Sequence, residues 1–219
     1  MALVKICGLT DPHMVRVAAE AGSDWAGFVL FPKSPRNVLG HGADALEDVI
    51  ELSGFAQELG LASVILMVDP SEELFESVLR DVTPDAIQLH GKESPEKVMR
   101  YWRDSDGVCE LWKALGVSNV DDLSDLDQWR SDRFLMDAKP PEDADLPGGN
   151  GEAIDWSILE GFETDRPWLL AGGLTPENVA DAVAATGAHA VDVSSGVERI
   201  RGVKDEDLIR AFIDAAKSV

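Results

Sequence analysis

The stretch Ala2-Leu3-Val4-Lys5-Ile6-Cys7-Gly8-Leu9-Thr10-Asp11-Pro12 shows how this chain is organised. The apolar run at its start predicts a buried strand, and Gly8 predicts a turn after it. Asp11-Pro12 then predicts the start of a helix that runs to about Ala21 and ends at Gly22. A strand, a turn and a helix form half of a βαβ unit, so the fold depends on how often this pattern returns.

The pattern returns along the whole chain. Further strands are predicted over 25–31, 62–68, 86–90, 108–115, 133–137, 168–171 and 190–193. The helical segments that follow them are predicted over 43–59, 71–80, 95–103, 119–129, a short turn near Trp156, 176–185 and 205–217. The stretch 138–151, rich in Pro and Gly, predicts a long loop.

Eight strand–helix units in 219 residues predict an α/β fold, a (β/α)₈ barrel that forms one domain over residues 1–219. The alternative is a doubly wound open sheet. Its Gly-x-Gly-x-x-Gly fingerprint is missing after the first strand, so the barrel is preferred.

The charge of the chain is strongly unbalanced, with 19 Lys and Arg against 41 Asp and Glu and a formal net charge of −22. Such a surface repels nucleic acids and anionic membranes, so neither is an expected partner. The acidic residues are spread over presumed helix and loop surfaces, which favours adaptation to high salt in a halophilic organism. The alternative is an acidic protein without such adaptation.

Two cysteines, Cys7 and Cys109, do not form a disulfide framework and match no zinc-site spacing. The chain starts on a short strand without a long apolar signal region, and no apolar run reaches membrane-spanning length. We therefore expect a cytoplasmic protein with reduced thiols and no metal. We expect Cys109 to be part of the core.

In a barrel of this kind, chemistry gathers where the strands end and the βα loops begin. A phosphate site is predicted from Gly172 and Gly173 after the seventh strand and from Ser194, Ser195 and Gly196 after the eighth. Glycines allow the backbone to approach phosphate oxygens, and serine hydroxyls add hydrogen-bond donors. The structural alternative is a tight turn with capping serines, and the position of both loops favours phosphate.

Titratable residues occupy the same edge. Cys7 ends the first strand and Asp137 ends the sixth, so a thiol and a carboxyl group can form a base and acid pair. A functional thiolate needs a lowered pKa, for which Lys5 and Arg36 are candidate cations, and Lys5 shares a strand face with Cys7. Taken alone, Cys7 also fits core packing, Asp137 a loop hydrogen bond and Arg36 a solvated loop. For His90, a loop-anchoring hydrogen bond is preferred over a catalytic role.

Taken together, the motifs closely resemble the phosphoribosylanthranilate isomerase family. The matching segments run in family order across nearly the whole chain: Lys5-Ile6-Cys7-Gly8-Leu9-Thr10, Gly27-Phe28, Ser34-Pro35-Arg36, Gln88-Leu89-His90-Gly91, Phe134-Leu135-Met136-Asp137, Gly148-Gly149-Asn150-Gly151, Asp155-Trp156, Ala171-Gly172-Gly173-Leu174-Thr175-Pro176-Glu177-Asn178-Val179 and Asp192-Val193-Ser194-Ser195-Gly196-Val197-Glu198. Departures are an acidic loop over 138–145 and Ile154 in place of an aromatic residue.

The resemblance implies an enzyme of tryptophan biosynthesis, an intramolecular oxidoreductase of the aldose–ketose, Amadori type. Its substrate is a small phosphorylated molecule, N-(5-phosphoribosyl)anthranilate, which it isomerises without a cofactor. Asp137 aligns with the general acid and Cys7 with the general base, while Arg36 matches the position that pairs with the anthranilate carboxylate. The glycine and serine loops match the phosphate grip, and Asp192 also matches, to orient Arg36 or the ribose. The expected assembly is a monomer or a homodimer.

Two other functions stay open. A histidine-pathway isomerase performs the same chemistry on a related barrel, but an Asp in place of Cys7 would point to it. A phosphosugar-binding barrel without activity is the alternative outside catalysis, and the presence of both Cys7 and Asp137 argues against it.

Overall fold

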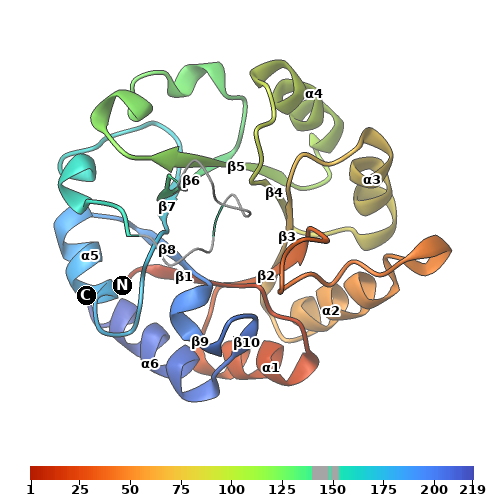
Figure 1. The fold of residues 1–219 in the computed structure, drawn as a ribbon, viewed down its shortest axis with the longest axis horizontal. Helices are drawn as coiled ribbons and strands as arrows, with labels where there is room; N and C mark the ends of the chain where they lie inside the picture. Colours follow the sequence, from red (N-terminus) through yellow and green to blue (C-terminus); the bar gives the residue numbers. More distant parts are fainter. Residues whose placement is uncertain (140–147, 149–152) are drawn as a thin grey trace.

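A computed structural model describes residues 1–139, 148 and 153–219 of the chain. Parallel strands lie side by side in chain order, and the last pairs with the first to close a barrel (Figure 1). The barrel strands are β1 (Leu3–Cys7), β2 (Trp25–Leu30), β3 (Ala62–Met67), β4 (Ala86–Leu89), β5 (Glu110–Val117), β6 (Arg133–Ala138), β7 (Trp168–Leu170) and β8 (Ala190–Val193). The predicted (β/α)₈ barrel is confirmed.

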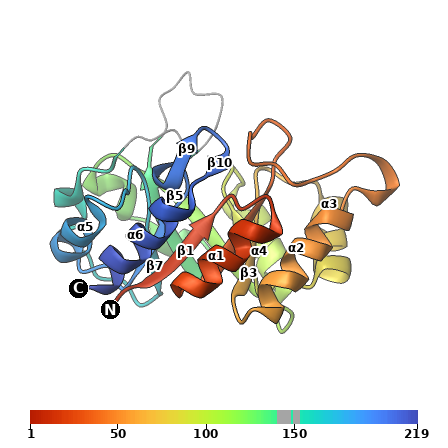
Figure 2. The same cartoon turned by 90° about the horizontal axis from the view of Figure 1, so that it is seen from below.

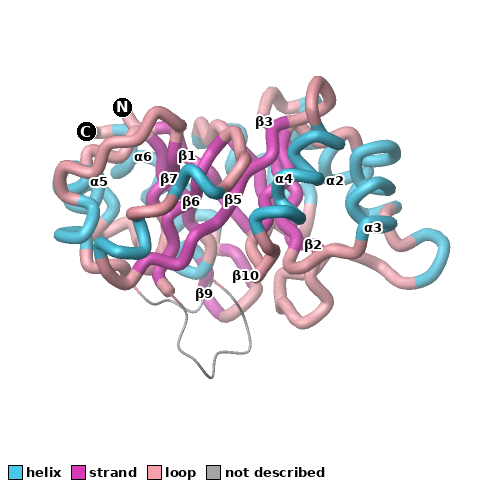
Figure 3. The backbone as a smooth tube through the Cα atoms, turned by 90° about the horizontal axis from the view of Figure 1, so that it is seen from above, coloured by secondary structure: helices cyan, strands magenta, loops and turns pink. Residues whose placement is uncertain are grey.

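Helices surround the strands, as the tube in Figure 3 shows. Within the described ranges the α-helices are α1 (Pro12–Ala21), α2 (Glu47–Glu58), α3 (Glu72–Ser77), α4 (Pro95–Ser105), α5 (Val179–Thr186) and α6 (Glu206–Lys217). Shorter turns are the 3₁₀ segments Gly42–Asp44, Val120–Leu123, Leu126–Gln128, Trp156–Leu159 and Ser195–Val197, and the π turn Val78–Val82. None of the described helices has the length and apolar character needed to cross a bilayer.

The helix predicted over 119–129 is wrong, because two 3₁₀ turns stand in its place. Asn119 and Asp122 form a capping box, in which the Asn119 side chain accepts from backbone N–H groups and Asp122 accepts from the Asn119 N–H. Side chains that bond their own backbone in this way compete with the regular helical ladder. The Asp- and Ser-rich composition therefore ends each turn before a helix can grow.

Other helix boundaries shift by a few residues. α2 starts at Glu47 after a separate 3₁₀ turn, and α3 ends at Ser77, where the π turn begins. α5 starts at Val179 because Asn178 bonds the Thr175 N–H and the Gly173 carbonyl, which holds residues 175–178 in a turn. Most of the loop predicted over 138–151 lies outside the described residues.

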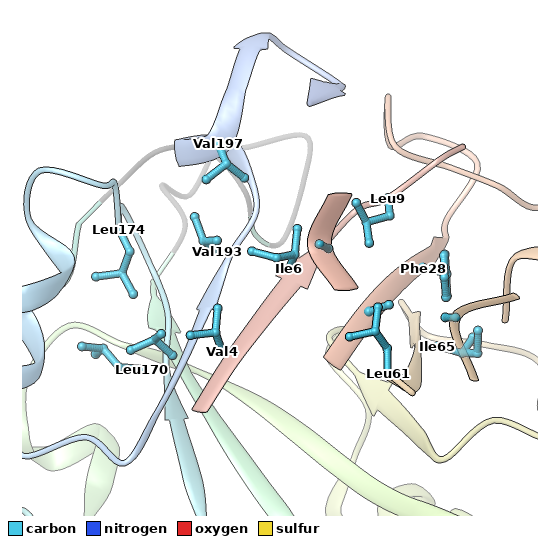
Figure 4. Packing of buried hydrophobic residues seen from close by; sticks show 14 of the residues in the cluster. Val4, Ile6, Leu9, Phe28, Leu61, Ile65, Leu170, Leu174, Val193 and Val197 are labelled. Carbon is cyan, nitrogen blue, oxygen red and sulfur yellow. The ribbon is translucent and has the colours of Figure 1, made fainter. Parts of the chain in front are cut away.

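The two faces of each strand meet different surroundings, because successive side chains point to opposite sides of a sheet. In β1, Val4 and Ile6 belong to the hydrophobic cluster between barrel and helices, together with Val193 and Leu170 (Figure 4). Lys5 and Cys7 therefore point into the barrel, as their shared strand face predicted.

Large apolar side chains fill the barrel interior near the starts of the strands. This lower layer contains Trp25, Val64, Ala86, Trp112, Leu135, Leu169 and Ala190. The rings of Trp25 and Trp112 meet edge to face at 5.5 Å, which is a favourable aromatic geometry. Only a smaller cluster of Cys7, Val29 and Leu66 lies near the carboxyl ends. Apolar side chains thus fill the barrel interior near the starts of the strands, whereas polar side chains enter it near the carboxyl ends.

A two-stranded hairpin, β9 (Glu198–Ile200) and β10 (Val203–Lys204), follows β8. Figure 2 shows this hairpin and the two chain termini at opposite ends of the barrel. The hairpin therefore belongs to the end at which the strands finish and the βα loops begin.

Candidate active site

A pocket opens at the carboxyl ends of the strands. Its lining residues are Cys7, Val29, Phe31, Ser34, Arg36, Leu66, Val68, His90, Asp137, Gly148, Asp192 and Ser194. Five of these were predicted as site residues, and they come from β1, β6, β8 and two loops. Roomier hollows lie against residues 162–168 and the amino ends of strands, but no predicted site residue lines them.

Cys7 lies at the top of β1 and is only 3% exposed. Two residues earlier in β1, the fully buried Lys5 forms an ion pair with Asp192 of β8, with Nζ and Oδ1 2.8 Å apart. The strand register places these two residues directly opposite each other. Gly27 of β2 makes room for the group, since a methyl group there would lie 3.0 Å from Cys7 Sγ and 3.1 Å from Lys5 Nζ.

The expectation of a lowered thiol pKa is contradicted. Burial raises the pKa of Cys7 above its ordinary value, while Lys5 opposes this shift by its charge and a hydrogen bond. Asp192 adds to the increase, because it sits on the other side of Lys5 and neutralises much of its field. The surroundings of Cys7 therefore favour the neutral thiol over the thiolate. For Lys5, burial would lower the pKa, but Asp192 and Cys7 outweigh it and raise the pKa.

Asp137 ends β6 on the other side of the pocket and is 8% exposed. Its Oδ1 accepts the N–H of Ala138 at 2.8 Å, and its Oδ2 lies 3.2 Å from Nε2 of His90. The other ring nitrogen of His90 lies 2.9 Å from the amide nitrogen of Gln88, which is fully buried. An amide N–H donates, so this contact assigns the proton of the neutral ring to Nε2, where it points at Asp137.

His90 was expected to anchor its loop, and the structure instead joins it to the carboxyl group predicted as the acid. Gly148 closes over both, since a methyl group there would lie 2.5 Å from His90 Nε2 and 2.8 Å from Asp137 Oδ2. Gln88 Oε1 is buried and has no hydrogen-bond partner among the described residues. The same loop after β4 is held by a buried ion pair between Glu93 and Lys113 of β5, at 2.8 Å.

Arg36 is also buried, at 3% exposure, although it comes from a loop. Its Nε and Nη2 donate to the two carboxylate oxygens of Glu198, at 2.6 and 2.9 Å. The idea that Asp192 orients Arg36 is therefore replaced: Glu198 orients Arg36, and Asp192 holds Lys5. Burial would raise the pKa of Glu198, but Arg36, Lys204 and a backbone N–H outweigh it and lower the pKa to about 2.

The two predicted phosphate loops are in contact. Gly172 and Gly173 have φ values of +81° and +64°, which favour glycine, and a methyl group at Gly196 would overlap the Leu174 carbonyl oxygen. Ser194 lines the pocket, and Ser195 starts the short 3₁₀ turn that ends at Val197. Gly172 lies beside the acid, since a methyl group there would be 3.1 Å from Asp137 Oδ1. Of this set, only Ser194 belongs to the pocket lining.

Glu198 and Lys204 were not predicted as site residues. Lys204 is 4% exposed and donates to Glu198 Oε1 at 2.9 Å and to the Ser194 carbonyl at 2.8 Å. A sequence signal existed, because buried strand positions rarely hold a lysine without a carboxylate partner. The partner itself is visible only once the hairpin is folded.

Comparison with known proteins agrees with this arrangement. The family model described as N-(5′-phosphoribosyl)anthranilate (PRA) isomerase matches residues 4–215. A curated relative from Hyphomonas neptunium, named N-(5′-phosphoribosyl)anthranilate isomerase, is 51% identical over 220 residues, covering 100% of this chain and 98% of the relative. One of the same name from Paramagnetospirillum magneticum is 48% identical, covering 98% and 96%.

Solved structures give the same result. A phosphoribosyl anthranilate isomerase from Thermotoga maritima superposes with a TM-score of 0.83 at 36% identity, covering 100% of both chains. A phosphoribosyl anthranilate isomerase in complex with reduced 1-(o-carboxyphenylamino)-1-deoxyribulose 5-phosphate has a TM-score of 0.79 at 34% identity, also with full coverage of both chains. The match of the family model, the curated relatives and these structures over essentially the whole length shows that this chain belongs to the N-(5′-phosphoribosyl)anthranilate isomerase family.

Proposed function

We propose that this enzyme isomerises N-(5-phosphoribosyl)anthranilate to 1-(2-carboxyphenylamino)-1-deoxyribulose 5-phosphate, with Asp137 as general acid and Cys7 as general base. Asp137 protonates the ring oxygen of the ribose while the anilino nitrogen forms a double bond to C1′, which opens the ring to a Schiff base. Cys7 then removes the proton from C2′ and gives an enolamine. Loss of the enol O–H proton and addition of a proton at C1′ complete the ketone, so atoms and electrons balance without a cofactor.

The surroundings of Asp137 support its role as the acid. Oδ1 is occupied by the Ala138 N–H, which leaves Oδ2 as the oxygen that faces the pocket and His90. A proton on Asp137 Oδ2 can pass to a ring oxygen within hydrogen-bond reach of the carboxyl group. His90 is then a positioning residue, whose Nε2 contacts Oδ2 and orients the acid.

The surroundings of Cys7 support its role as the base. Its thiol lines the same pocket as Asp137 and has Lys5 as its cationic neighbour. Burial of Cys7 works against its deprotonation, and the charge of Lys5 favours the thiolate. A weakly populated thiolate is a strong base, which suits removal of a carbon-bound proton.

Two kinds of binding group line or flank the pocket. The Arg36 guanidinium is the proposed partner of the anthranilate carboxylate, because a planar guanidinium pairs well with a carboxylate. Gly172, Gly173, Ser194, Ser195 and Gly196 are the proposed phosphate grip. Asp192 keeps Lys5 charged beneath Cys7, and because Asp192 also lines the pocket, its proposed role towards the ribose is kept.

Family membership favours this activity over the histidine-pathway isomerase and over a binding barrel without catalysis, and Cys7 and Asp137 both line one pocket. We further propose a cytoplasmic, single-domain enzyme that acts as a monomer or homodimer. One Thermotoga maritima relative is described as dimeric, with engineered monomers.

The observation that carries this proposal is the presence of a thiol and a carboxyl group in one pocket flanked by a guanidinium and two glycine loops. The test is to add purified protein to freshly prepared phosphoribosylanthranilate and follow the loss of its fluorescence, in dilute buffer and at high salt. Turnover is expected. Its absence under both conditions would reject the proposed activity.

A further inference from the structure

A single buried carboxylate, Glu198, binds two cations: Arg36, which lines the pocket, and Lys204. Its Oε1 accepts from Arg36 Nε at 2.6 Å and from Lys204 Nζ at 2.9 Å. Its Oε2 accepts from Arg36 Nη2 at 2.9 Å and from the Gly202 N–H at 2.9 Å. The side chains of Glu198, Arg36 and Lys204 are only 3%, 4% and 2% exposed, so solvent screens these interactions little.

The hairpin of β9 and β10 creates this cluster, because it brings Glu198 and Lys204 together at its open end. Gly202 forms the turn with φ +85° and lies against the loop that carries Arg36, since a methyl group there would be 3.0 Å from the Pro35 carbonyl oxygen. The hairpin thus rests directly on the Arg36 loop. Its residues are added after β8 and are not needed to close the barrel.

Lys204 extends the cluster to the loop that carries Ser194. Its Nζ donates to the Ser194 carbonyl at 2.8 Å and lies 3.2 Å from the Ser194 hydroxyl oxygen. A continuous chain of contacts therefore runs from Arg36 through Glu198 and Lys204 to Ser194. The arginine stem also packs here, since a methyl group at Gly8 would lie 2.6 Å from Arg36 Cδ and 3.1 Å from the Ser194 hydroxyl oxygen.

Among the described residues, the charges of the cluster do not balance. Two cations, Arg36 and Lys204, share the one carboxylate of Glu198 in a protein whose formal net charge is −22. Burial lowers the pKa of Lys204, and Glu198 is the main group that opposes this shift. Loss of the carboxylate would therefore weaken the charge on Lys204 as well as release Arg36.

We propose that Glu198 is a positioning residue, which fixes the Arg36 guanidinium relative to the phosphate loop so that the enzyme selects substrates carrying a carboxylate and a phosphate at this separation. The inference rests on the proposed function, in which Arg36 pairs with the anthranilate carboxylate and the Ser194 loop binds phosphate. Glu198 itself does not touch the substrate. It acts by holding Arg36 through both carboxylate oxygens and Ser194 through Lys204.

The test uses two substrates, phosphoribosylanthranilate and the analogue made from aniline, which lacks the carboxylate. The measured quantity is the carboxylate preference, defined as kcat/KM for phosphoribosylanthranilate divided by kcat/KM for the aniline analogue. In Glu198→Gln the preference should fall at least about tenfold, because a misplaced charged hydrogen bond costs about 1.5–3 kcal/mol. The loss should appear mainly in KM for the carboxylate substrate.

The matched control is Glu110→Gln. Glu110 also pairs with an arginine, Arg133, at 2.9 Å, but this pair lies at the amino ends of β5 and β6. The carboxylate preference of Glu110→Gln should equal that of the wild type. Glu198→Asp, which keeps the charge but shortens its reach, serves if the Gln variant does not fold, and should show a smaller fall of the same sign.

Arg36→Met separates the inference from the proposed function. If Arg36→Met does not lower the preference, the role of Arg36 itself is wrong. If Arg36→Met abolishes the preference while folded Glu198 variants keep it, only the positioning role of Glu198 is wrong. An equal loss for both substrates in the Glu198 variants would also overturn the inference, because it would indicate general damage to the fold.

Discussion

The two walls of the active-site pocket use opposite electrostatic designs. On the wall of β1 and β8, charges are buried in pairs, with Lys5 on Asp192 and with Arg36 and Lys204 on Glu198. On the wall of β4 and β6, Asp137 meets the polar side chains of His90 and Gln88, and one buried amide oxygen has no partner among the described residues. The base therefore faces fixed cations, whereas the acid is oriented by the side chains of His90 and its partner Gln88.

The contrast fits the two proton transfers. A thiol becomes a base only if a cation favours its thiolate, and a cation that is itself paired with a carboxylate gives limited help. A carboxyl group serves as an acid only if it regains its proton after each turnover, and Asp137 lines the pocket, from which a proton can return to it. The wall with fixed charges therefore binds the substrate and favours the thiolate of Cys7, while the other wall orients the acid.

Removing either catalytic group should have the largest effect on the rate. Cys7→Ala and Asp137→Asn should each lower kcat about 10²–10⁴-fold, since each removes one proton-transfer group. Affinity for the reduced product analogue should stay within a few-fold of the wild type, because the binding groups are untouched. Steady-state kinetics and calorimetry give the two values.

The control for the thiol is Cys109→Ala. Cys109 is the other cysteine in the chain, is partly buried, and has its pKa raised by burial to about 12. It lies outside the pocket lining, so its variant should keep normal kcat. Near-normal activity in Cys7→Ala or Asp137→Asn would remove that residue from the mechanism.

The raised pKa of Cys7 predicts the pH dependence of the rate. Since the base is active only when deprotonated, kcat/KM should keep rising with pH beyond about 8.5, the ordinary pKa of a thiol. Alkylation of Cys7 by iodoacetamide should follow the same curve and should slow further in Lys5→Met, which loses the cation that lowers the pKa. A plateau of both curves well below pH 8 would show that the free enzyme already holds a thiolate.

Changing the histidine on the other wall should have an intermediate effect. His90→Asn removes the ring that lies 3.2 Å from Asp137 Oδ2 and should lower kcat about tenfold, less than Asp137→Asn, because the acid itself remains. The fall should appear in kcat with KM nearly unchanged, which general loss of packing would not produce. An unchanged kcat would reduce His90 to the loop-anchoring role first expected for it.

Salt should affect the surface more than either wall. Repulsion among the exposed acidic residues is screened by ions, whereas the buried pairs are screened little. The melting temperature should therefore rise by several degrees from dilute buffer to molar salt, as expected for a halophilic protein. A scanning calorimetry series with KCl would measure this, and a constant or falling melting temperature would reject adaptation to salt.

The barrel and the position of its rim residues were predictable because strand alternation and turn glycines are local signals. Lys5 and Cys7 share a strand face because they are two residues apart. Gly8 and Gly172 have positive φ values, and each lies in the turn after a strand. The error over 119–129 has a local cause as well, since Asn119 and Asp122 bond their own backbone. Propensity alone does not settle that competition.

The partners inside the site were not predictable in the same way. Asp192 is 187 residues from Lys5, and Glu198 is 162 residues from Arg36. Such pairs form only when β8 closes on β1 and the hairpin folds back on the Arg36 loop. The sequence pattern predicted that Cys7, Asp137 and Asp192 lie at the carboxyl ends of the strands. Which charged side chains form ion pairs depends on the closure of the barrel.

The most direct test of the account is the turnover of freshly prepared phosphoribosylanthranilate by the wild type, Cys7→Ala and Asp137→Asn in parallel, run in D₂O with the product analysed by NMR. The account predicts rapid conversion by the wild type with deuterium at C1′ of the product, and rates at least about 10²-fold lower in both variants. Wild-type rates in either variant, or no conversion by the folded wild type, would contradict it.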